Sequence, residues 1–123
     1  MVSVPGFLLR RLYVKESLKN GAVGYEFQLK NGLGSGYARR MLPIVVDGDE
    51  VAQGRTFFVL DGQETAFDSV SEANPFTLPM NRAINIWVDG EKLLPGPHKI
   101  EMGFEVPGLG TMKFDFTDTV ADE

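Results

Sequence analysis

The chain has 123 residues, the length of a single domain, and its 43% hydrophobic and 24% charged residues make an ordinary globular composition. It contains no cysteine, which excludes a disulfide framework and thiolate chemistry and fits a cytoplasmic location. The net charge of −5 argues against a nucleic acid or a membrane surface as a partner. Every charge-free stretch is much shorter than the ~20 residues that a membrane-spanning helix needs.

Taken in chain order, the apolar residues mostly follow a period of two, which is typical of half-buried β-strands. In 23–30 every second residue is apolar, and 99–106 and 111–117 repeat the pattern on either side of "PGLG", which predicts an antiparallel hairpin. The strands expected from these patterns are 7–14, 23–30, 40–46, 56–60, 83–88, 99–106 and 111–117. One short helical turn is expected at 68–73, where Ser69 and Glu72 have capping-box spacing.

Strands of this length, separated by turn residues, predict an all-β, antiparallel two-sheet β-sandwich. The whole chain, 1–123, forms one domain in this interpretation, with 118–123 as a frayed tail. The inward positions of the alternating strands give the expected core: Tyr25, Phe27, Leu29, Ile100, Met102, Phe104, Phe114 and Phe116.

Asp-Gly occurs three times after an apolar run, in "VVDGDEV", "VLDGQET" and "WVDGEKL". Asp-Gly suits the two positive φ angles of a two-residue hairpin, so the sequence favours three turns at Asp47, Asp61 and Asp89. The alternative is calcium binding, which needs a longer array of oxygen ligands than "DGDE" offers. We therefore expect no metal at these turns.

No residue pattern predicts a catalytic, cofactor-binding or metal-binding site in this chain. The one histidine, His98, has no second histidine or cysteine to make a zinc site and is interpreted as an ordinary residue at the start of a strand. The serines lie outside any nucleophile-elbow context. A glycosidase pair among the 17 acidic residues stays open, although most of them fall on turns or on polar strand faces.

The stretch "KNGLGSGYARRMLP" is either a flexible glycine-rich loop or a recognition loop. As a recognition loop it would present Tyr37, Arg39 and Arg40, whose residue types are enriched in interface hot spots. Trp87 alternates out of phase with its apolar neighbours, so it either covers an outer surface or lies in a strand buried on both faces. These four residues are the expected partner interface.

Four stretches in order resemble the small β subunit of bacterial C-glycoside deglycosidases: "SLKNGAVGYEFQLKN" (17–31), "GYARRMLP" (36–43), "IVVDGDEV" (44–51) and "LLPGPHKIEMGFEV" (93–106). The resemblance implies a non-catalytic β subunit of a carbon–carbon lyase. Its partner would be an α subunit, a barrel that holds a divalent metal, manganese, while this chain holds no cofactor. The complex would cleave 3-oxo C-glucosides of flavonoids by elimination, because a ketone at C3 acidifies the proton at C2.

A second hypothesis belongs to a different class of protein. The chain could be a stand-alone β-sandwich that binds carbohydrate or protein, with Tyr37 and Trp87 as stacking platforms.

Overall fold

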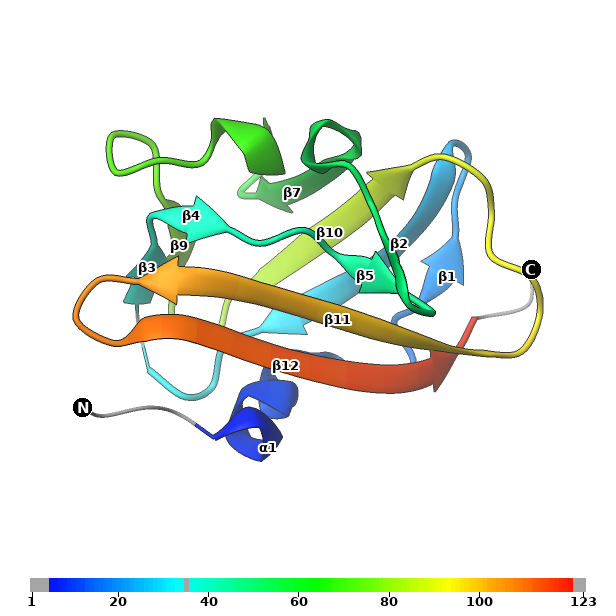
Figure 1. Ribbon diagram of the computed structural model, residues 1–123, viewed down its shortest axis with the longest axis horizontal. Helices are drawn as coiled ribbons and strands as arrows, with labels where there is room; N and C mark the ends of the chain where they lie inside the picture. Colours follow the sequence, from blue (N-terminus) through cyan, green and yellow to red (C-terminus); the bar gives the residue numbers. More distant parts are fainter. Residues whose placement is uncertain (1–4, 35, 121–123) are drawn as a thin grey trace.

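The computed structural model describes residues 5–34 and 36–120. These residues form twelve strands and four short helical segments (Figure 1). The helical segments are α1 (Gly6–Leu9), η1 (Arg10–Leu12), η2 (Gln53–Arg55) and η3 (Phe67–Ser69). The strands are β1 (Lys19–Asn20), β2 (Gly24–Lys30), β3 (Gly36–Ala38), β4 (Arg40–Met41), β5 (Val45–Val46), β6 (Asp49–Glu50), β7 (Thr56–Leu60), β8 (Gln63–Ala66), β9 (Phe76–Leu78), β10 (Ala83–Asp89), β11 (Pro97–Val106) and β12 (Gly110–Thr119).

The strands form two antiparallel sheets and one small ribbon. The first sheet has the order β1-β2-β10-β7-β8, and the second has the order β12-β11-β5-β6 with β4 also paired to β11. The ribbon consists of β3 and β9 and lies near the turn between β11 and β12 (Figure 1). The expected all-β, antiparallel two-sheet fold is confirmed.

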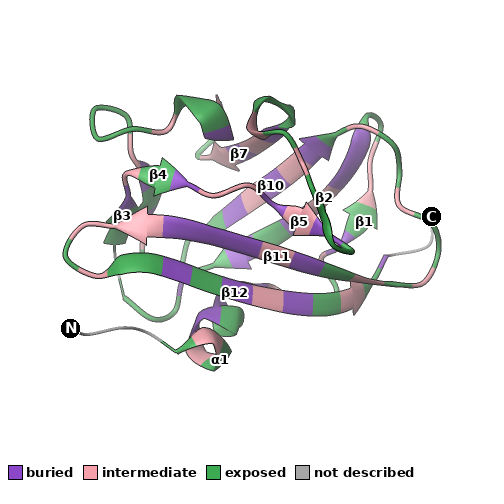
Figure 2. Ribbon diagram, in the orientation of Figure 1, coloured by how far each residue is buried: buried purple, intermediate pink, exposed green. Residues whose placement is uncertain are grey.

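The core lies between the two sheets, and all eight residues expected there are buried (Figure 2). The aromatic ring of Phe27 on β2 meets the ring of Phe116 on β12 edge-on at 5.3 Å between centroids. Tyr13 stacks on Phe116 with 3.6 Å between centroids. These rings join the two sheets, since β2 and β12 belong to different ones.

The long strands β2, β10, β11 and β12 form where period-two alternation predicts them. The β11–β12 hairpin has the expected register, with Phe104 opposite Met112 and Ile100 opposite Phe116. On β10, the inward residues Ile84, Ile86 and Val88 are buried and Trp87 lies on the outer face.

The prediction of a strand at 7–14 is wrong, because 6–12 forms the helical turns α1 and η1. Leu9 and Leu12 are three residues apart, which places both on one face of the turns, and both are buried. The Arg10 guanidinium donates from Nε to the backbone carbonyl of Asp115 at 2.6 Å. The segment therefore packs against β12 as helical turns, and its apolar face is buried against the core.

Two other elements differ from the prediction in extent. The expected strand 40–46 is split into β4 and β5, with Pro43, which lacks a backbone donor, between them. The helical turn expected at 68–73 is η3, at Phe67–Ser69, and the Ser69 hydroxyl donates to the carbonyl of Ala66. The capping box with Glu72 is not formed.

The end of the chain is ordered further than expected. β12 continues through Thr119, and Val120 is buried against the core. Asp118 accepts hydrogen bonds from the Tyr13 hydroxyl at 2.7 Å and from the Glu16 N–H at 2.8 Å. Fraying therefore does not begin at 118; the rest of the expected tail, 121–123, lies outside the described residues.

In the described part of the chain, no helix is long and apolar enough to cross a membrane.

Candidate functional site

An apolar hollow opens at one end of the sandwich, between α1, the β3–β9 ribbon and the β11–β12 turn. Its volume is about 420 Å³. The lining residues are mostly aliphatic and come from several separate elements and turns: Leu8, Leu9, Leu12, Asn31, Leu33, Gly34, Gly36, Tyr37, Leu78, Phe104, Val106, Leu109 and Met112. This volume and lining are typical of sites that bind an apolar group.

Two side chains at the rim of the hollow are exposed. Leu33 is 43% exposed and Tyr37 is 46% exposed. Phe7, on the neighbouring helix α1, is 66% exposed. Exposed apolar side chains around an apolar depression mark interaction sites more often than isolated surface residues do. The hollow is therefore the strongest candidate for a binding site.

Asn31 fixes the loop that carries Leu33. Its side chain is 2% exposed, and its Nδ2 donates to the Leu78 carbonyl at 2.8 Å. Its Oδ1 accepts from the Leu33 N–H at 3.0 Å. A buried amide with both ends bonded holds a loop in one conformation. Sequence reasoning missed Asn31, although the Asn-Gly pair at 31–32 is a turn signal that marks the position.

The structure separates the four residues expected at a partner interface. Tyr37 lines the apolar hollow. The Arg39 Nε donates a hydrogen bond to the Glu105 carboxylate at 2.6 Å, and the Arg39 Nη1 lies 3.4 Å from the Glu72 carboxylate. Glu105 is the main reason that the pKa of the Arg39 guanidinium is raised. Arg40 is exposed on β4, so only Tyr37 of this group belongs to the hollow.

Trp87 lies on the outer face of the first sheet, away from the residues that line the apolar hollow. Its ring stacks on Phe57 with 4.4 Å between centroids, and its Nε1 donates to Glu64 at 2.9 Å. Trp87 therefore covers an outer surface, the first of the two alternatives, and does not lie in a strand buried on both faces. Its neighbours leave it half-buried.

Residues 36–41, part of the stretch expected as a flexible or recognition loop, form β3 and β4. Ala38 and Met41 are buried there, so this segment contributes to the core as well as to the rim of the hollow.

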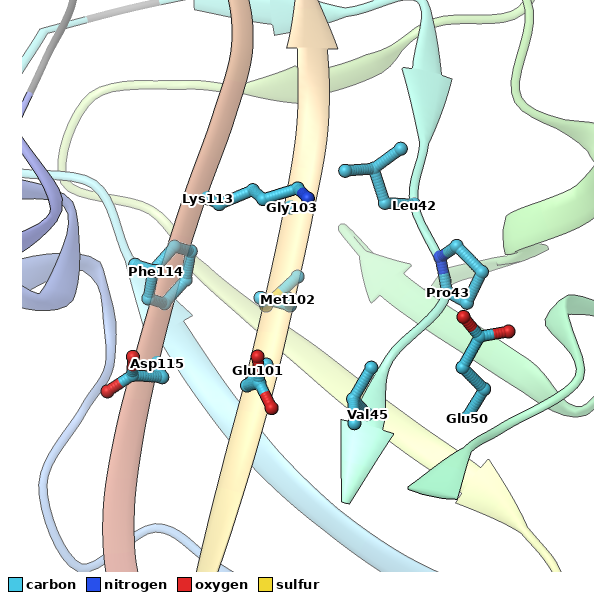
Figure 3. A pocket seen from close by; sticks show the side chains of 10 residues that line it. All are labelled: Leu42, Pro43, Val45, Glu50, Glu101, Met102, Gly103, Lys113, Phe114 and Asp115. Atoms are coloured by element: carbon cyan, nitrogen blue, oxygen red, sulfur yellow. The ribbon is translucent and has the colours of Figure 1, made fainter. Parts of the chain in front are cut away.

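A smaller hollow of about 280 Å³ lies on the outer face of the second sheet (Figure 3). Three carboxylates, Glu50, Glu101 and Asp115, line it together with Lys113. Glu101 and Asp115 are cross-strand neighbours, but β5 lies between Glu101 and β6, which carries Glu50. Among the described residues, no three metal-ligating side chains converge.

Two of the three Asp-Gly pairs form the expected turns. Asp47 and Gly48 join β5 to β6, and Asp61 and Gly62 join β7 to β8, each with both φ angles positive. The third is not a two-residue hairpin, because Asp89 is still paired with Gly24 at the end of β10. The loop that follows leads instead from the first sheet to β11 in the second.

His98, interpreted from the sequence as an ordinary strand residue, makes polar contacts through both ring nitrogens. Its Nδ1 lies 2.6 Å from the Asp47 carboxylate, and its Nε2 lies 2.7 Å from the Leu94 carbonyl oxygen. Both ring nitrogens face acceptors, so the doubly protonated imidazolium fits best, and these two contacts raise the pKa of His98. The hydrogen bond from His98 is the main reason that the pKa of Asp47 is lowered. The pair ties the β5–β6 turn to the start of β11.

This pair predicts that stability falls as the pH rises above neutrality. The pKa of His98 is raised from 6.5, so its contribution is complete below pH 6.5 and is lost as pH rises through the higher folded-state value. The pKa of Asp47 is lowered from 3.8, so its contribution is present above pH 3.8 and is lost as pH falls through the lower value. We expect the wild-type chain to lose about 1 kcal/mol of unfolding free energy between pH 6 and 9.

The measurement is the urea midpoint at several pH values for the wild type and for His98→Gln. Because His98 is the only histidine, the variant removes the main group that titrates in this range. Its midpoint should stay nearly constant. Equal slopes in the two proteins would show that the His98–Asp47 contact contributes nothing.

The family model of the hydroxymethylglutaryl-CoA reductase N-terminal domain matches residues 8–121. No curated protein matches the chain. The family match overturns the resemblance to a C-glycoside deglycosidase β subunit, and with it the predicted lyase function on flavonoid C-glucosides. It also gives no support to the alternative of a stand-alone carbohydrate-binding domain.

The stretches that carried the deglycosidase resemblance have a structural explanation. Residues 17–31 contain β1 and β2, 44–51 is the β5–β6 hairpin, and 93–106 leads into β11. Many β domains share alternating strands and Asp-Gly turns. These stretches therefore indicate the fold class but do not identify the family.

Proposed function

The chain belongs to the family of the hydroxymethylglutaryl-CoA reductase N-terminal domain, and we propose that it is a non-catalytic domain that docks on a catalytic partner of the reductase type. The observation that carries this proposal is the apolar hollow. The family is described as a domain of the reductase, which fits a part that acts together with another. In this proposal, hydroxymethylglutaryl-CoA is turned over by the partner.

The shape and chemistry of the hollow support docking. Tyrosine is enriched among the residues that dominate binding energy, and Tyr37 stands half-exposed at the rim. The loop of Leu33 is held by Asn31, so little conformational entropy is lost when a partner covers it. An apolar group of the partner would fill the hollow and remove Leu33 and Tyr37 from water.

The chemistry in this proposal is left to the partner. The sole histidine has both ring nitrogens committed to Asp47 and Leu94, which leaves neither free to act as a general base. A divalent metal or any other cofactor would likewise be held by the partner. The cytoplasmic location expected from the cysteine-free composition stays a prediction, which cell fractionation would test.

Leu33→Asp should weaken the complex with the partner at least tenfold. A carboxylate at this position would be desolvated against the apolar group that fills the hollow. The test is co-expression of the chain with the catalytic domain of a hydroxymethylglutaryl-CoA reductase from the same genome. Affinity would be measured by calorimetry.

Leu94→Asp is the matched control, because Leu94 is 76% exposed and lies outside the residues that line the hollow. It should bind like the wild type. Failure of the wild-type chain to form a complex would overturn the proposal, as would equal binding by the two variants. Reduction of hydroxymethylglutaryl-CoA by the chain alone would overturn its non-catalytic part.

A further inference from the structure

A second, basic hollow adjoins the apolar one, and the two share Leu33 in their walls. The basic hollow has a volume of about 370 Å³ and is lined by Arg11, Val14, Lys30, Gly32, Leu33 and Asn81. Among the residues that the structure describes, none that lines either hollow carries a carboxylate. This contrasts with the chain as a whole, which has 17 acidic and 12 basic residues.

The fold brings the two cations together from separate elements. Arg11 lies in η1, and Lys30 is the last residue of β2. An antiparallel bridge between Tyr13 and Leu29 holds the segment after η1 alongside the end of β2. The Val14 N–H donates to the Gln28 carbonyl at 2.9 Å and continues this pairing.

Arg11 and Lys30 differ from several other cations of the chain. Lys19, Arg10, Arg39 and Arg82 each pair with a carboxylate within the domain. In the described part of the chain no such ion pair involves Arg11 or Lys30, and both are exposed. Complementary charge across an interface speeds association and selects the partner.

We infer that the partner segment that fills the apolar hollow is acidic, with carboxylate side chains that contact Arg11 and Lys30 beside an apolar anchor. The inference rests on the proposed function and adds the chemistry of the docking segment. The shared wall at Leu33 places the apolar and the charged contacts next to each other, so one short amphipathic segment can make both. Part of the affinity is therefore electrostatic and falls as salt rises.

The first test uses the complex of the full chain with the reductase catalytic domain. Arg11→Glu combined with Lys30→Glu should weaken binding about tenfold or more at low salt, because like charges then face each other. Lys92→Glu combined with Lys99→Glu is the matched control, since it makes the same change in net charge at exposed residues outside both hollows. The control should stay within about twofold of the wild type.

Arg11→Gln combined with Lys30→Gln guards against misfolding, because it removes the charges without adding carboxylates. It should weaken binding less than the glutamate pair and should flatten the dependence of affinity on salt. If Leu33→Asp weakens the complex while both Arg11/Lys30 variants bind like the wild type, the proposed function stands and the inference fails.

The second test does not depend on the reductase partner. Two peptides of twelve residues carry the same leucine and phenylalanine anchors, flanked by glutamate in one and by lysine in the other. Amide chemical shifts of the full chain should respond more strongly to the glutamate peptide, with changes around Arg11, Lys30 and Leu33. Equal responses to the two peptides, or a preference for lysine, would overturn the inference even if the reductase complex forms.

Discussion

Replacement of Phe27 by alanine is expected to lower the free energy of unfolding by about 3–5 kcal/mol, one of the largest effects of any single change in this domain. Phe27 is fully buried, and its ring meets Phe116 of the opposite sheet edge-on at 5.3 Å. It also meets Tyr13 at 6.1 Å, so truncation opens a cavity where three parts of the chain converge. Urea denaturation monitored by tryptophan fluorescence would measure the loss.

Phe7→Ala is the matched control, since it removes the same atoms from a ring that is 66% exposed. It should change the unfolding free energy by no more than about 0.5 kcal/mol. If Phe27→Ala does not fold, Phe27→Leu should remain folded with a smaller loss. Similar losses for Phe27→Ala and Phe7→Ala would mean that the interface between the sheets is not where this structure places it.

Replacement of Gly24 by alanine is expected to cost about 3 kcal/mol, at the upper end for overpacking, because the clash is with backbone. Gly24 pairs with Asp89 where β2 meets β10. An added Cβ would clash with the backbone carbonyl oxygen of Val88, so the two strands would have to move apart. Hydrogen exchange should show faster opening of the β2–β10 ladder, together with the loss in equilibrium stability.

Gly32→Ala provides the comparison for Gly24→Ala, because no heavy atom lies within 4 Å of a Cβ at that position. It should be neutral or stabilise by about 0.4–1 kcal/mol, through a smaller conformational entropy of the unfolded chain. Equal stabilities of the two variants would remove the steric argument for glycine at position 24.

The exposed side chains that could bind a partner are unevenly distributed over this domain. On the outer faces of the sheets, several charged or half-buried side chains are bonded to neighbours, such as Trp87 with Glu64 and Arg39 with Glu105. The end of the sandwich near α1 instead combines exposed Leu33 and Tyr37 with the unpaired charges of Arg11 and Lys30 among the described residues. This asymmetry is why the proposals concern one end of the molecule.

The sequence by itself determined the fold class and much of the core. Period-two alternation is a local property, since successive side chains of a strand point to opposite faces, so β2, β11 and β12 and their buried residues could be predicted without tertiary information. The same is true of the turns at Asp47 and Asp61, where Asp-Gly has a strong local preference. Local patterns could not identify the family, because many β domains share them.

Only the tertiary structure decided the helical start of the chain and the candidate site. The mainly apolar segment 7–14 suits a strand or a helix by itself, and packing of Leu9 and Leu12 against the core selects the helix. The sequence pointed to Tyr37, but its hollow is built from α1, β3, β9 and the β11–β12 turn, and the pairs Arg11–Lys30 and Asp47–His98 join distant parts of the chain. Such proximity follows from strand order and pairing across the whole domain, which no local pattern encodes.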